Sequence, residues 1–120
     1  MKYLSILAIL ILSFNPSYAQ DYLTITDDRI EVSIDSNANA ADLEDIKVQL
    51  SQVDITLEYP ILEFNKDGRL KEISFTVDCN DGYKGSASKE FSFINRGLIG
   101  FYRDYNNFFK NAFGTFSKPN

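Results

Sequence analysis

The residues of this 120-residue chain that are able to do chemistry are few, and they begin with a single thiol. Cys79 is the only cysteine, and the sequence contains no histidine. Without an imidazole the chain lacks Ser-His-Asp and Cys-His nucleophilic sites and the commonest zinc ligand. Cys79 continues the alternation of Ile73, Phe75 and Val77, which predicts a small buried residue on a strand. An intermolecular disulfide and a reactive thiol are the alternatives for this residue.

The carboxylates offer no convincing metal site or acid–base pair. The segment Asp78–Gly82 resembles a calcium loop, but it is one residue too short and no glutamate follows at the required distance. The pairs Asp27-Asp28 and Glu44-Asp45 are adjacent only in sequence. Neighbouring side chains point to opposite faces of a strand and diverge by about 100° on a helix. The sequence therefore predicts a protein that is not an enzyme and has no cofactor or metal ligands.

Aromatic residues are the other feature with functional potential. Seven of them gather near the C-terminal end: Phe101, Tyr102, Tyr105, Phe108, Phe109, Phe113 and Phe116. Their spacing fits a helical stripe, although Leu98–Arg103 equally fits a last strand. These rings either complete the core and then fray, or form an exposed segment that docks on a partner. With the turn around Asn80–Gly85, the candidate partner-binding residues are Tyr83, Phe101, Tyr102, Tyr105, Phe108 and Phe109.

The charge distribution excludes one large class of partners. The chain has 17 acidic and 12 basic residues, for a formal net charge of −5. Eight of the acids but only one base, Arg29, lie between Asp21 and Asp45. An acidic chain without a basic stripe is a poor nucleic-acid binder, so no nucleic-acid partner is expected. The acidic segment is either a solvated face or a surface that attracts cations or a partner.

The first nineteen residues have the pattern of a cleaved signal peptide. Lys2 precedes the apolar run Leu4–Leu12, and Ser17-Tyr18-Ala19 matches the small-x-small cleavage rule. The run is too short for a good membrane span, and no second apolar segment resembles one. An uncleaved anchor is the alternative. We therefore expect an exported protein, periplasmic or extracellular, with no transmembrane segment in the mature chain that begins at Gln20.

The element around which the rest is organised is an amphipathic helix from Asn39 to Val53. Asn39 occupies the N-cap position, and Asp42 follows three residues later as the acid of a capping box. One apolar stripe recurs at helical spacing: Leu43, Ile46, Leu50 and Val53. The stripe is expected to cover one face of a sheet.

Strand-like segments flank this helix. Alternating or apolar runs predict strands at 29–35, at 55–64 with a break or bulge at Pro60, at 70–79 and at 86–94. Asn65–Gly68 and Asn80–Gly82 are strong turn signals. The prediction is an α+β domain in β-α-β-β-β order, with one helix packed on a small, mainly antiparallel sheet. Its bounds are 29–104, between a loose segment at 20–28 and an aromatic tail at 105–120.

Part of this pattern resembles a known family. The segments Ile34–Tyr59, Phe64–Gly68 and Ile73–Phe75 resemble the extracytoplasmic C-terminal region of bacteroidete BlaR-type antirepressor membrane metallopeptidases. That region has a capped helix, a strand, an N-x-x-G turn into another strand and a Gly/Asn-rich hairpin. Here Asn39 replaces the usual threonine cap, and Ile99–Asp104 is similar to a later strand. The resemblance covers two-thirds of the mature chain and implies a small α+β module of the bacterial envelope. It implies no peptidase activity, because the membrane helices and the HExxH motif are absent.

Three functions remain open from the sequence. The first is an exported, non-catalytic module that binds a protein or envelope component, or has a structural role. The second is a secreted inhibitor or accessory factor, since one helix over an antiparallel sheet is also the plan of cystatin-like inhibitors. Their Gln-x-Val-x-Gly loop is not present, because Gln52-Val53 is followed by Asp54-Ile55. The third is a hydrolase that uses carboxylates alone.

Overall fold

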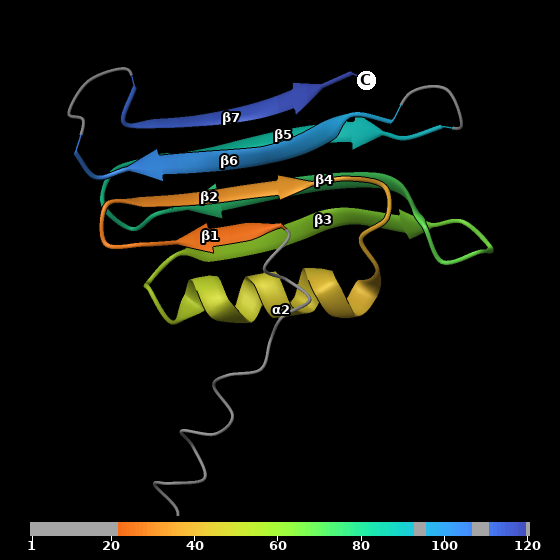
Figure 1. Ribbon diagram of the computed structural model, residues 1–120, viewed down its shortest axis with the longest axis horizontal. Coiled ribbons are helices and arrows are strands. Elements are labelled where there is room, and N and C mark those ends of the chain that lie inside the picture. Colours follow the sequence, from red (N-terminus) through yellow and green to blue (C-terminus); the bar gives the residue numbers. More distant parts are fainter. Residues whose placement is uncertain (1–21, 93–95, 107–110, 120) are drawn as a thin grey trace, which may run out of the picture.

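Two antiparallel sheets, stacked face to face and edged by one helix, make up the described part of the chain (Figure 1). The computed structural model describes residues 22–92, 96–106 and 111–119. The elements within these ranges are β1 (Leu23–Ile25), β2 (Arg29–Ile34), α2 (Ala40–Ser51), β3 (Thr56–Phe64), β4 (Leu70–Asp78), β5 (Lys84–Glu90), β6 (Leu98–Asp104) and β7 (Phe113–Lys118). The α+β class is confirmed, although strands dominate. The single sheet that we predicted is replaced by two.

The two sheets divide the chain by position in the sequence. One sheet has the order β1-β2-β6-β7 and unites both ends of the described chain. The other has the order β3-β4-β5 and contains only the middle. In the first sheet β2 runs antiparallel to β6, with Ile34 opposite Ile99. The predicted β-α-β-β-β order therefore lacks β1 and the β6–β7 hairpin.

The N-terminal cap of α2 has the predicted geometry. The Asn39 side chain accepts a hydrogen bond from the Asp42 backbone N–H at 2.8 Å, and the Asp42 carboxylate accepts one from the Asn39 N–H at 3.1 Å. Leu43, Ile46 and Leu50 are buried, as predicted. Val53 is the exception, because the helix ends at Ser51 and leaves the Val53 side chain 38% exposed.

The helix covers an edge of the sandwich rather than the face of a sheet. In Figure 1, α2 lies beside the edge strands β1 and β3, below both sheets. The inner face of each sheet is already covered by the other sheet, so the apolar stripe of α2 closes the gap at their edge. The Tyr59 hydroxyl of β3 donates a hydrogen bond of 2.7 Å to the Leu43 carbonyl and fastens the helix there. Burial, followed by the nearby carboxylate of Glu44, raises the pKa of Tyr59.

The break that we predicted at Pro60 is a bulge inside β3. The register with β4 shifts between Glu58 and Ile61, and the strand continues to Phe64. Proline has no N–H for a ladder, but β3 is an edge strand and needs partners on one side only. The Asn65–Gly68 turn that follows is also confirmed. Gly68 has φ of +88°, and its N–H bonds to the Asn65 carbonyl at 3.0 Å.

Two further strands correct the predictions for the ends of the chain. Leu23–Ile25, in the segment expected to be loose, pairs with β2, and Leu23 is part of the core. Phe113–Lys118, in the aromatic tail, forms β7 on β6 rather than a helical stripe. The first strand is too short for alternation to reveal it. In the second, Gly114 interrupts the pattern, because the Tyr102 ring packs where its side chain would stand. The predicted signal peptide lies outside the described residues.

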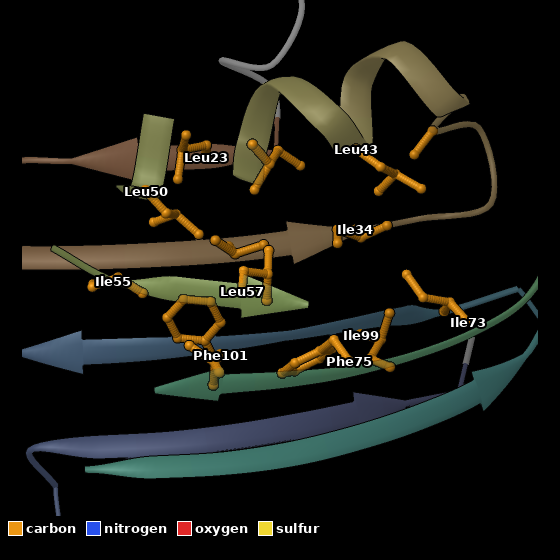
Figure 2. Close-up of a cluster of buried hydrophobic side chains, with 14 of the residues drawn as sticks. Leu23, Ile34, Leu43, Leu50, Ile55, Leu57, Ile73, Phe75, Ile99 and Phe101 are labelled. Atoms are coloured by element: carbon orange, nitrogen blue, oxygen red, sulfur yellow. The ribbon is translucent and has the colours of Figure 1, made fainter. Parts of the chain in front are cut away.

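The core lies between the sheets and continues under the helix. Figure 2 shows side chains from both sheets and from α2 pointing toward one another. Its largest fully buried members are Ile30, Ile34, Leu43, Ile46, Leu50, Ile55, Leu57, Leu70, Ile73, Phe75, Ile99 and Phe101. The rings of Phe75 and Phe101, one from each sheet, have centroids 6.0 Å apart. The alternation predicted for the 29–35 and 70–79 strands therefore identified the buried side chains correctly.

Candidate functional site

Four of the six predicted partner-binding residues are among those that the structure describes, and these four lie in three different environments. Phe101 is fully buried, because its side chain points between the sheets, so it is a core residue rather than part of an exposed docking surface. Tyr102, the next residue of β6, faces the other way and lies half-buried under the Arg29 guanidinium, 4.7 Å from the ring centroid. Tyr83 and Tyr105 lie together at one end of the sandwich. Phe108 and Phe109 lie outside the described residues.

Tyr83 and Tyr105 are brought together by an arginine that the sequence analysis did not single out. The guanidinium carbon of Arg103 lies 4.4 Å from the centroid of the Tyr83 ring and 4.5 Å from that of Tyr105. Two of its nitrogens, Nε and Nη2, contact the same Asp81 oxygen at 2.9 and 2.8 Å. We call Asp81, Tyr83, Arg103 and Tyr105 the Arg103 cluster.

Four of the five N–H groups of the Arg103 guanidinium contact partners within the chain. Besides Asp81, its Nη1 donates to the backbone carbonyls of Asp104 at 2.9 Å and Ala112 at 3.2 Å. The Arg103 side chain is only 10% exposed, whereas that of Asp81 is 33% exposed. These contacts leave this buried arginine at most one N–H for a ligand anion, and its main role here is to hold two tyrosine rings in place.

Several connections meet around this cluster, at the left of Figure 1. The Tyr105 N–H donates to the Asp28 carbonyl of the β1–β2 turn at 2.9 Å. The Asn80 side chain, from the β4–β5 turn, donates to the Asp54 carbonyl after α2 at 2.8 Å. Tyr105 is 36% exposed, and burial is the main cause that raises its pKa. At this end of the sandwich the connections are therefore linked by hydrogen bonds, and one aromatic ring is exposed.

The thiol of Cys79 is buried beside the same cluster, as predicted. Burial, and after it the negative charge of Asp81, raises the pKa of Cys79 to about 11. The positive charge of Arg103 acts in the opposite direction. The reactive form of cysteine is the thiolate. The environment therefore suppresses the reactivity of this residue instead of activating it.

We expect Cys79 to resist alkylation in the folded protein at mildly alkaline pH. With a pKa of about 11 in place of 9.0, its thiolate fraction is about 100-fold lower than in the unfolded chain. The rate of reaction with iodoacetamide, with and without urea, measures this difference. Since the folded state holds the proton more tightly, the thiol's contribution to stability is complete below about pH 9 and is lost as the pH rises through about 11. Equal labelling rates in the two states would contradict the expectation, and the absence of a second cysteine makes the readout unambiguous.

The other carboxylates do not assemble into a site. Asp27 and Asp28 are exposed in the β1–β2 turn. Asp45 accepts a hydrogen bond of 2.9 Å from the Gln49 side chain along the helix. In the ranges 22–92, 96–106 and 111–119, no three histidine, cysteine, aspartate or glutamate side chains come together as metal ligands would.

Arg103 and Asp81 were missed although the sequence held a signal for the first of them. Ile99, Phe101 and Arg103 alternate along β6, so all three point into the sandwich. A charged residue at an inward position needs a counter-charge, because burying a lone guanidinium is very unfavourable. No comparable signal identified Asp81 as that counter-charge, since the pairing joins the β4–β5 turn to β6, 22 residues further along the chain.

Comparison with known proteins assigns no family to this chain. No protein-family model, no curated protein and no solved structure matches the chain. The resemblance to the BlaR-type modules therefore stays a prediction. No helix among the described residues is long and apolar enough to cross a membrane.

Proposed function

We propose that this chain is an exported, non-catalytic module that binds a protein or envelope component through the end of the sandwich that carries the Arg103 cluster. The observation that carries the proposal is the position of Tyr83 and Tyr105 on two sides of the buried Arg103. Tyr83 from the Asn80–Gly85 hairpin and Tyr105 from the aromatics after Phe101, both suggested from the sequence, lie on this one cluster.

Physical reasoning supports this surface as a recognition site. Tyrosine is enriched at protein interfaces because a large ring with few rotatable bonds buries much area at a low entropy cost. Here the rings are already fixed by a guanidinium that an ion pair and two carbonyls hold. Such preorganisation lowers the free energy lost on binding. The exposed acids Asp28 and Asp54 lie near Tyr105, so the complementary surface is basic.

Export is supported by the signal-peptide pattern of residues 1–19 alone. The mass of the protein recovered from the periplasm or culture medium tests it, and a chain that begins at Gln20 is the result we expect. A full-length chain retained in the cytoplasm would contradict export. A secreted inhibitor would use the same surface on a protease as its partner, and a protease-inhibition screen tests that alternative.

The binding role is tested by photo-crosslinking in the native envelope from a photoreactive residue at position 105. Position 102, on the outer face of the first sheet, is the matched control. We expect a defined adduct from position 105 only. With the identified partner, Tyr105→Ala should weaken binding by about 10-fold or more, as for an interface hot spot, and Tyr102→Ala by less than about 2-fold. Adducts from neither position, or the same adducts from both, would overturn the proposal.

A further inference from the structure

A cavity lies at the end of the sandwich opposite the Arg103 cluster (Figure 1), beside the β3–β4 turn, and is also lined by Phe91, Ser92 and Arg96. Its volume is about 280 Å³, and its wall includes three cationic side chains, Arg69, Lys71 and Arg96. Asp67 is the one acid that lines it, while Asn65 adds an amide and Phe91 an apolar surface. We call this cavity the basic pocket.

The walls of the basic pocket are fixed by backbone hydrogen bonds between separate segments. The Leu70 N–H bonds to the Ser36 carbonyl at 3.0 Å, which ties the start of β4 to the segment before α2. The Phe91 N–H bonds to the Lys71 carbonyl at 2.9 Å, which holds Phe91 against β4. The hollow is therefore part of the fold and does not depend on long side chains alone.

The charges in the basic pocket are not balanced within it. Arg69 approaches Asp67 at 4.0 Å, the longest ion-pair distance in the described chain, and the two side chains are 50% and 64% exposed. Lys71 and Arg96 make no ion pair with any residue in the described ranges. Three cations and one carboxylate leave two positive charges on a chain whose formal net charge is −5. Like charges around one hollow repel one another, and a bound anion removes that repulsion.

We propose that the basic pocket binds a phosphomonoester. This is a second site, separate from the binding surface proposed at the Arg103 cluster. A phosphomonoester carries about −1.5 to −2 charges at neutral pH, which matches the two unbalanced positive charges, whereas a carboxylate carries one. Guanidinium groups of Arg69 and Arg96 suit the tetrahedral oxygens, since arginine binds phosphate through two parallel N–H bonds. Phe91 supplies an apolar contact for the organic part of the ligand.

Isothermal titration calorimetry of the full mature protein in low-salt chloride buffer tests the proposal. The probes are glucose 6-phosphate, inorganic phosphate, gluconate and glucose. We expect glucose 6-phosphate to bind more tightly than inorganic phosphate, and gluconate and glucose to show no binding. Lys71→Gln and Arg96→Gln should each weaken binding by about 10-fold, because each removes a charge-assisted contact. Lys84→Gln, an equal charge change at the far end of the sandwich, should leave it unchanged.

The outcomes distinguish phosphomonoester binding from binding of any anion and from an effect of diffuse surface charge. Binding of gluconate as strong as that of glucose 6-phosphate would overturn it, and so would equal losses for Lys84→Gln and Lys71→Gln, which indicate diffuse surface charge. No heat with any phosphate probe would overturn it as well. Co-sedimentation with phosphatidylcholine vesicles that contain phosphatidic acid then distinguishes a lipid headgroup from a soluble ligand, and either source supports the proposal. Tyr105→Ala should bind glucose 6-phosphate normally, so failure of one proposal leaves the other intact.

Discussion

Replacing Phe101 with alanine is expected to lower the free energy of unfolding by about 3–5 kcal/mol, as for other buried phenylalanines. The Phe101 ring is fully buried between the sheets, with centroids of the Phe75 and Phe113 rings at 6.0 and 6.4 Å. Truncation removes apolar contacts to both sheets at once and leaves a cavity that neither sheet is free to fill. Urea denaturation followed by circular dichroism measures the loss.

Phe116→Ala is the matched control for this prediction. Phe116 lies on β7 and is only half-buried, so its removal leaves a space that solvent fills. We expect its effect to be less than half that of Phe101→Ala. A stable Phe101→Ala protein with a normal transition would mean that the ring does not belong to the core. The aromatic residue at this position would then be free to act as the partner contact that the sequence first suggested.

Replacing Asp81 with alanine is expected to destabilise the protein by about 3 kcal/mol, at the lower end of the range for a broken buried ion pair. The loss arises because Arg103 stays charged inside the sandwich, with 10% of its side chain exposed and its nearest carboxylate gone. The two backbone carbonyls and the two tyrosine rings that remain around it offset only part of that loss. Thermal unfolding of the variant beside the parent protein gives the measurement.

Asp67→Ala removes the same chemical group from an exposed ion pair. Its partner Arg69 is half exposed and 4.0 Å away, so water replaces the lost contact and the effect should be at most about 1 kcal/mol. Equal losses for Asp67→Ala and Asp81→Ala would show that burial of Arg103 does not govern the Asp81 pair. The difference between the two variants is therefore the quantity that tests the electrostatics of the cluster.

Local features of this fold were predictable because their causes lie within a few residues. The capping box of Asn39 and Asp42 needs only one helical turn of sequence, and it is present as predicted. The same holds for the turn at Gly68, where a positive φ favours glycine. Alternation along β2 and β4 likewise identified which side chains are buried.

The remaining features depend on contacts between distant segments, which local patterns do not encode. Alternation shows that one side of a strand is buried, but a helix and a second sheet bury it equally well. The sequence therefore predicted correctly which residues point inward. It predicted wrongly that the helix, rather than a second sheet, packs on them. The Arg103 cluster has the same origin, since Tyr83 and Tyr105 meet only because β5 and β6 belong to facing sheets. The basic pocket likewise joins Arg69 and Arg96 from two separate connections.

The strand connectivity of the first sheet also sets an order of events during folding. The β3-β4-β5 sheet consists of successive hairpins and requires only short loop closures. The pairing of β2 with β6, in contrast, must wait until the whole of that middle segment has been synthesised. Closing so long a loop is slow, because its entropy is lost before the contacts that compensate for it are made. A newly made chain therefore stays incompletely folded until its last two strands are available.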